Sequence, residues 1–121
     1  MAAPNLVNVS TITAKSTQGA LTTTLTTEFL ANAAASGKVY KVNNILVANI
    51  DGTNAADASV FITKSGGSPV AVASTISVPA DSSLVVIDKN TSIYLEEGDN
   101  IEAGASADSD LVITINYEEL S

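Results

Sequence analysis

Several side chains on which enzymes and metalloproteins depend are missing from this chain of 121 residues. There is no cysteine, histidine, arginine or tryptophan, so all five basic residues are lysines. Without Cys and His, disulfides, thiolate or imidazole metal ligands and Ser–His or Cys–His nucleophile pairs are excluded. Without Arg, the bidentate clamp for phosphate or carboxylate groups is also absent. The composition predicts a protein that is not an enzyme and that holds no cofactor or metal.

Positive charge is scarce as well. Five Lys stand against thirteen Asp and Glu, which gives a net charge of −8 and a pI near 4.1. Nucleic acid and anionic membrane surfaces are therefore disfavoured as partners, because both attract basic proteins. Residues 1–50 carry a net +2 (three Lys, one Glu), whereas residues 51–121 carry −10 (two Lys, twelve acids). This split predicts a docking end and a solvated end; alternatively, the acids simply occupy exposed loops.

A signal peptide and long apolar runs are not apparent. Residues 1–10 have neither a basic start nor an apolar segment, and no run approaches the roughly 18 apolar residues of a membrane helix. We therefore expect a chain that is made in the cytoplasm and does not cross a membrane. Its mean hydropathy of +0.28 is high for a small monomer, which favours burial in an oligomer or larger assembly.

What the chain does contain is a series of segments patterned like β-strands. The longest, KVYKVNNILVANIDG at residues 38–52, is dense in Val, Ile and Leu and ends in an Asp-Gly turn signal. Alternation places two sets of apolar residues on opposite sides of it: Val39, Ile45 and Val47, and Tyr40, Val42, Leu46, Ala48 and Ile50. Apolar residues on both sides predict a central strand, covered on both faces by the protein itself or by another copy.

Turn signals recur roughly every 8–12 residues, and about nine short strands are predicted between them. An alternating segment at 9–15 ends in a turn at Gln18–Gly19, and a half-buried strand follows at 21–29. A hairpin turn is expected at 65–68 (SGGS). The remaining strands are predicted at 38–50, 58–64, 70–78, 84–87, 92–95, 100–105 and 111–117.

This pattern predicts an all-β fold: an antiparallel, jelly-roll-like β-sandwich of about eight to nine strands. Residues 1–20 would form an N-terminal arm and the first strand, and residues 21–121 would form the sandwich. A sandwich leaves edge strands open, which a symmetric oligomer or a docking site would cover.

Two acidic segments are the candidates for chemistry. In the loop at 51–57 (DGTNAAD), Asp51, Asn54 and Asp57 offer oxygen ligands to calcium, but these residues are also ordinary turn formers. The densest acidic cluster consists of Glu96, Glu97, Asp99 and Glu102. On an extended strand, two adjacent glutamates point to opposite faces, which does not suit the facing carboxylates of a glycosidase.

Several motifs follow one another in an order that resembles a known family. They are KVYKVNNILVANIDG, a Gly-Gly hairpin, VPADSSL, YLEEGDNI and the ending INYEEL, within roughly residues 20–120. Each motif is unspecific alone. As a set they resemble small virion structural proteins of tailed bacteriophages, those of cyanophages included.

The resemblance implies a β-sandwich that decorates or cements a capsid on the virion surface, bound to the major capsid protein and arranged as a homotrimer or symmetric ring. It implies no catalytic residues. By analogy, residues 1–20, Lys38 and Lys41 would face the capsid, with the acidic loops outward. The alternatives are a neck or tail component and a carbohydrate-binding host-adhesion module, which a row of exposed tyrosines at 40, 94 and 117 would favour. A small hydrolase using Glu96 or Glu97 would need a cleft and a raised carboxylate pKa.

Overall fold

The observed secondary structure consists almost wholly of strands and turns. The computed structural model describes residues 8–121, so residues 1–7 of the predicted N-terminal arm lie outside the described part. Nine strands run through the described part: β1 (Ile12–Ala20), β2 (Thr27–Ala31), β3 (Val39–Asn49), β4 (Ala56–Thr63), β5 (Val70–Val78), β6 (Ser83–Ile87), β7 (Ile93–Leu95), β8 (Asn100–Ala105) and β9 (Leu111–Leu120). One short 3₁₀ turn, η2 (Lys89–Thr91), precedes β7. The predicted all-β class is confirmed.

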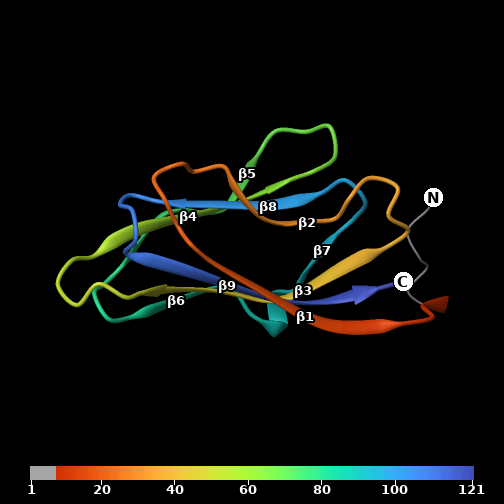
Figure 1. Cartoon of the computed structure of the whole chain (residues 1–121), viewed down its shortest axis with the longest axis horizontal. Helices are drawn as coiled ribbons and strands as arrows, with labels where there is room; N and C mark the ends of the chain where they lie inside the picture. Colours follow the sequence, from red (N-terminus) through yellow and green to blue (C-terminus); the bar gives the residue numbers. More distant parts are fainter. Residues whose placement is uncertain (1–7) are drawn as a thin grey trace.

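The strands form two antiparallel sheets that pack face to face (Figure 1). The five-stranded sheet has the order β1-β9-β3-β6, with β7 pairing with another part of β3, and the four-stranded sheet has the order β2-β8-β4-β5. If the short β7 is set aside, the first strand pairs with the last, the second with the second-to-last, and so on inward to the β4–β5 hairpin. This nesting is the jelly roll, as predicted.

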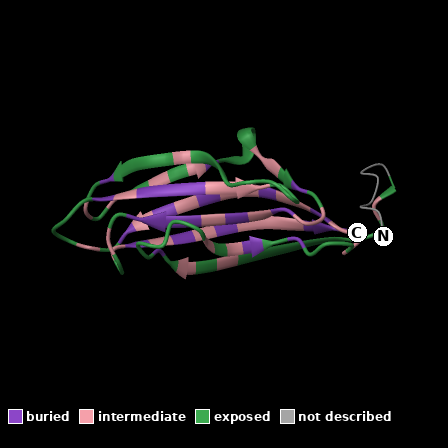
Figure 2. Ribbon diagram, turned by 90° about the horizontal axis from the view of Figure 1, so that it is seen from above, coloured by how far each residue is buried: buried purple, intermediate pink, exposed green. Residues whose placement is uncertain are grey.

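The hydrophobic core lies between the two sheets. Inward-facing side chains of the central strands are fully buried, among them Ile113 and Ile115 on β9, Val47 on β3 and Ile101 on β8. Figure 2 shows the buried colour along the inner strands and the exposed colour along the outermost ones. Each such side chain contributes about 1.5–3 kcal/mol through removal from water, so this layer supplies most of the stabilisation.

β3 is the central strand of its sheet, as predicted, with β9 on one side and β6 and β7 on the other. The prediction of its two faces was wrong at one point. Val42 and Ile45 are both fully buried, although strict alternation places them on opposite sides. The register with β9 shifts between Val42 and Asn44, so Asn43 is an extra residue. A β-bulge of this kind moves the alternation by one position.

Two predictions near the N-terminus were also wrong. No turn forms at Gln18–Gly19, because β1 continues to Ala20. Gly19 instead permits close packing, since a Cβ there would lie 2.6 Å from the Phe29 ring. Residues 21–26 are not a strand but a loop over the outer side of β8, and only 27–31 form β2. A local pattern cannot show what a segment packs against, which explains both errors.

The later strands lie within a few residues of their predicted bounds. The hairpin turn between β4 and β5 is confirmed. Gly67 N donates to Lys64 O at 2.8 Å, and Gly66 has φ +74°, a conformation that favours glycine.

Candidate docking surface

The outward face of the five-stranded sheet, called the neutral face below, is almost uncharged. Directly opposite residues of antiparallel strands share a face, so the register defines its members. They form cross-strand rows from β1 through β9 and β3 toward β6 or β7: Ala20, Val112, Ala48 and Ser83; Gln18, Thr114, Leu46 and Val85; Ser16, Asn116 and Asn44; Ala14, Glu118, Lys41 and Tyr94; Ile12, Leu120 and Val39. Within these strands, Lys41 and Glu118 are the only charged residues of the face, and they lie opposite each other. The face is therefore neutral within a chain of charge −8.

Two shallow depressions follow the β1–β9 pair along the neutral face. The first has a volume of about 420 Å³ and is lined by Ala14, Lys15 and Ser16 of β1, Asn43 of β3, and Asn116, Tyr117 and Glu118 of β9. The second, of about 300 Å³, lies between Gln18 and Ala20 of β1 and Val112 and Thr114 of β9. The depressions form because the side chains on this side of β1 are small. Neither depression is enclosed, so the face suits contact with a complementary surface better than capture of a small substrate.

The outward face of the four-stranded sheet, called the acidic face below, differs sharply. It carries Glu28 on β2, Glu102 on β8 and Asp57 on β4, and none of its four strands contains a lysine. Glu28 and Glu102 are direct cross-strand partners, a like-charge arrangement that destabilises a sheet. The acidic face is therefore suited to contact with water.

The predicted division of charge into two halves of the sequence is wrong as a description of the molecule. β9 belongs to the acidic half, yet it lies between β1 and β3 in the neutral-faced sheet. Glu28 belongs to the nearly neutral half, yet it lies on the acidic face. The uncharged positions 112, 114 and 116 were visible in the sequence, but without the strand partners they did not indicate a surface.

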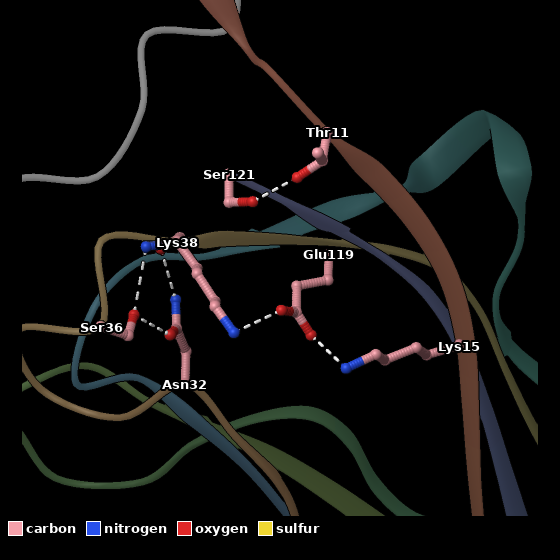
Figure 3. A network of polar contacts seen from close by, with 7 residues as sticks. All are labelled: Thr11, Lys15, Asn32, Ser36, Lys38, Glu119 and Ser121. Atoms are coloured by element: carbon pink, nitrogen blue, oxygen red, sulfur yellow. Dashed lines mark hydrogen bonds and ion pairs between the residues drawn. The ribbon is translucent and has the colours of Figure 1, made fainter.

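Glu119 connects three segments at one end of the five-stranded sheet (Figure 3). Its carboxylate accepts a hydrogen bond from Lys15 Nζ on β1 and forms an ion pair with Lys38, just before β3. The bonds from Lys15 and then Lys38 lower the pKa of Glu119, and the same contact with Glu119 raises the pKa of Lys15. Lys38, which the resemblance would turn toward a capsid, is thus engaged within the chain, whereas Lys41 lies on the neutral face.

The acidic cluster at residues 96–102 does not bring two carboxylates together across a cleft. Asp99 is buried, accepts hydrogen bonds from the amides of Glu96 and Ser65, and pairs with Lys64. Burial alone would raise the pKa of Asp99, but the bonds from Lys64 and from the two amides outweigh it, and the pKa is lowered. Glu97 accepts a backbone N–H from the loop before β3. These carboxylates stabilise turns.

Glu102 lies apart from that turn, on the acidic face. Its Oε1 accepts a hydrogen bond from Thr63 Oγ1 of the neighbouring β4 at 2.8 Å. The contact is a cross-strand link within the sheet.

The loop at 51–57 uses its oxygens internally. Asp51 Oδ1 accepts from the backbone N of Thr53 at 2.8 Å and of Asn54 at 3.3 Å, and these bonds lower the pKa of Asp51. Asp57 lies in β4, outside the loop. Across residues 8–121, no three Asp, Glu, His or Cys side chains come close enough together to hold a metal ion.

The three tyrosines do not form a row. The rings of Tyr40 and Tyr117 contact each other with centroids 5.1 Å apart and planes tilted by 34°, and both pack, half-buried, against the core. Tyr94 is exposed and lies on the other face of the sheet, because its neighbour Leu95 points into the core. A sugar ring would therefore find one exposed tyrosine here, and no platform of three.

Within the described residues, the chain has no helix that is both long and apolar enough to span a membrane. No protein-family model matches the chain, and no curated protein matches its sequence.

Proposed function

We propose that the chain is a non-enzymatic structural protein of a tailed-bacteriophage virion, a decoration or cement protein that binds the outside of the head shell. Its partner would be the major capsid protein, and it would work as a symmetric oligomer. Its mechanism would be mechanical: contact area spread over neighbouring shell subunits opposes their separation.

The neutral face is the observation that carries this proposal. A stable protein–protein interface buries about 1,200–2,000 Å² in total, which requires an extended surface. Burying unpaired charges in such an interface is costly, so a chain of charge −8 needs a face that lacks them. The neutral face offers five adjacent strands on which one lysine lies opposite one glutamate, while the acidic face opposite stays in water.

The fold and the sequence motifs support the same proposal less directly. Jelly rolls occur in viral capsid and lectin domains, but a fold alone does not specify a function. The motif order is the reason for choosing a phage virion. The three tyrosines form no exposed platform, so they give the carbohydrate-binding alternative no support. The other alternative, a place at the neck or tail, is distinguished from the proposal by copy number.

The first test is the abundance and position of the chain in virions. Particles would be purified from lysates of the source culture, the chain counted by quantitative mass spectrometry, and its position imaged with antibodies in the electron microscope. Hundreds of copies spread over the head are expected, as a shell of many repeated subunits requires. A dozen or fewer copies at one vertex would replace the proposal with a neck or tail role, and absence from particles would overturn it.

The second test asks which face binds. Val112→Glu places a carboxylate on the neutral face, and Ala31→Glu places the same group on the acidic face as a matched control. On particles stripped of the chain, Val112→Glu should rebind about a hundredfold more weakly, since ~3 kcal/mol is a modest cost for burying an unpaired charge. Ala31→Glu should rebind like the parent chain. Equal binding of both folded variants would reject the neutral face as the docking surface.

A further inference from the structure

The β5 edge, defined here as residues 65–78, is the outermost part of the four-stranded sheet next to β4. Among residues 8–121, β5 pairs with β4 on one side, and no strand pairs with its other side. Three large apolar side chains of this strand are exposed: Val70 by 65%, Val72 by 41% and Ile76 by 40%. Exposed apolar edge strands are uncommon in soluble proteins, because they invite pairing with another chain.

The β5 edge also lacks the charges that usually protect an edge. Residues 65–80 contain no charged side chain, although the whole chain has 18. The opposite edge of the same sheet carries Glu28 on β2, and the β1 edge of the other sheet carries Lys15. Beside β5 lies β6, whose strand is also uncharged. This side of the sandwich therefore lacks the charged side chains that discourage an edge strand from pairing with another chain.

We propose that the β5 edge is where two copies of this chain associate, around a two-fold axis near Ala73. A second copy suits this edge, because the repulsion between two chains of charge −8 is weakest where neither surface carries an acidic side chain. Antiparallel pairing of a strand with its own copy is compatible with two-fold symmetry. Around Ala73, it brings Val70 of one copy beside Ile76 of the other.

The side-chain directions suit this arrangement. Val70 lies opposite Ile62 and Ile76 opposite Ala58, two residues of β4 that face or pack against the core. Val70 and Ile76 therefore project to the same side of the sheet, as residues that meet across a strand pair must. The register with β4 shifts around Val72 and Thr75, so bulges interrupt the edge. The contact consequently depends on apolar side chains more than on an unbroken hydrogen-bond ladder.

This inference concerns self-association and does not rest on attachment to a shell, so either can fail alone. A two-fold contact also differs from the trimer that the family resemblance implies, and mass decides between them. Sedimentation of the full chain should give about twice the monomer mass of 12.3 kDa. Val70→Lys combined with Ile76→Lys should give a monomer with an unchanged circular dichroism spectrum. Ile50→Lys, at a site as exposed as Val70, should remain a dimer.

A cross-link gives a readout that does not depend on apolar-to-charged changes. The chain has no cysteine, so Val70→Cys combined with Ile76→Cys introduces two exposed thiols that the proposed axis brings beside those of the other copy. Under mild oxidation, this double variant should form a disulfide-linked dimer within minutes, whereas Ile50→Cys, at a similarly exposed site, should stay largely uncrosslinked. A parent chain that sediments as monomer or trimer would overturn the proposal. Equal cross-linking of the two cysteine variants, or a dimer that survives both lysines, would do the same.

Discussion

The two outward faces of this sandwich come from sheets of similar size, yet they differ in charge and in cover. The neutral face has one lysine, Lys41, opposite one glutamate, Glu118, whereas the acidic face has three carboxylates and no lysine on its strands. A loop at residues 22–26 crosses the acidic face over β8, where Ala105 N donates to Thr22 O at 2.8 Å. The inner faces are alike, since both bury aliphatic residues. The difference therefore lies in what each sheet presents to its surroundings.

The comparison shows that each outward surface of this fold is built from rows of residues that cross several strands. Each row of the neutral face combines residues from β1, β9 and β3, which are separated by up to about a hundred positions in the sequence. A charged residue at an outward position changes the charge of that surface, whereas the residue type at the neighbouring inward position is constrained by packing in the core. The two faces can thus be altered independently. Of the three experiments below, the first and third compare the faces and the second tests buried carboxylates outside them, in order of decreasing expected effect.

The first experiment compares a glycine on the acidic face with an alanine on the neutral face. A side chain at Gly104 would overlap the backbone of Thr24 and Leu25, so the loop would have to move. We expect Gly104→Val to lower the free energy of unfolding by at least ~3 kcal/mol, the upper range for overpacking. Ala20→Val, at an exposed outward position of β1, should change it by no more than about 0.5 kcal/mol. Urea unfolding measures the stability of both variants, and similar midpoints would contradict the close packing of the loop over Gly104.

The second experiment removes negative charge with acid. The folded-state pKa values of Asp99 and Glu119 lie below the ordinary values, so protonation favours the unfolded chain. Their contribution is fully present above those ordinary values, near pH 4, and is lost as the pH falls through the lowered ones. The raised pKa values of Lys15 and Lys64 leave both lysines charged throughout.

Urea titrations between pH 7 and pH 2 should therefore show constant stability at first and a decline in acid. Asp99→Asn should lower the neutral-pH stability by about 1–3 kcal/mol, through weakened hydrogen bonds to a charged group, and should make the decline shallower. Glu96→Gln is the matched control, because that carboxylate is exposed and 3.7 Å from Lys64. A decline unaffected by Asp99→Asn would show that this carboxylate does not contribute.

The third and smallest effect concerns the like charges on the acidic face. Glu28→Lys would turn the cross-strand repulsion with Glu102 into attraction. We expect a gain of about 0.2–1 kcal/mol, the usual size of a cross-strand charge pair, and a loss of that gain at high salt. Ser16→Lys, opposite the uncharged Asn116 on the neutral face, should have no comparable effect. A salt-insensitive gain would point to a cause other than charge.

Where turn chemistry punctuates the chain, local reasoning predicted the structure well. The Gly66–Gly67 hairpin, β5 and β8 follow from alternation bounded by Gly, Pro and Asp. Prediction from the local pattern failed where contact with a distant segment determines the structure. Gly19 resembled a turn residue, but it serves close packing against Phe29, and Asn43 gave no local sign of a bulge. Both depend on neighbours that are close only in space.

The two candidate surfaces, the β5 edge and the neutral face, also differ in how far the sequence predicts them. The absence of charge from residues 65–80 is a property of the sequence, and it marks the β5 edge directly. The neutral face could not be read from the sequence, because it exists only once β9 lies between β1 and β3.

By itself, the sequence determined that this is an all-β chain with a jelly-roll-like strand pattern and without cysteine, histidine or arginine. Those features follow from residue types and spacing, which act locally. Tertiary structure alone decided which carboxylates are held in turns, where the alternation of β3 shifts, and how charge is shared between two faces. Those outcomes depend on strand register, which joins residues far apart in the chain.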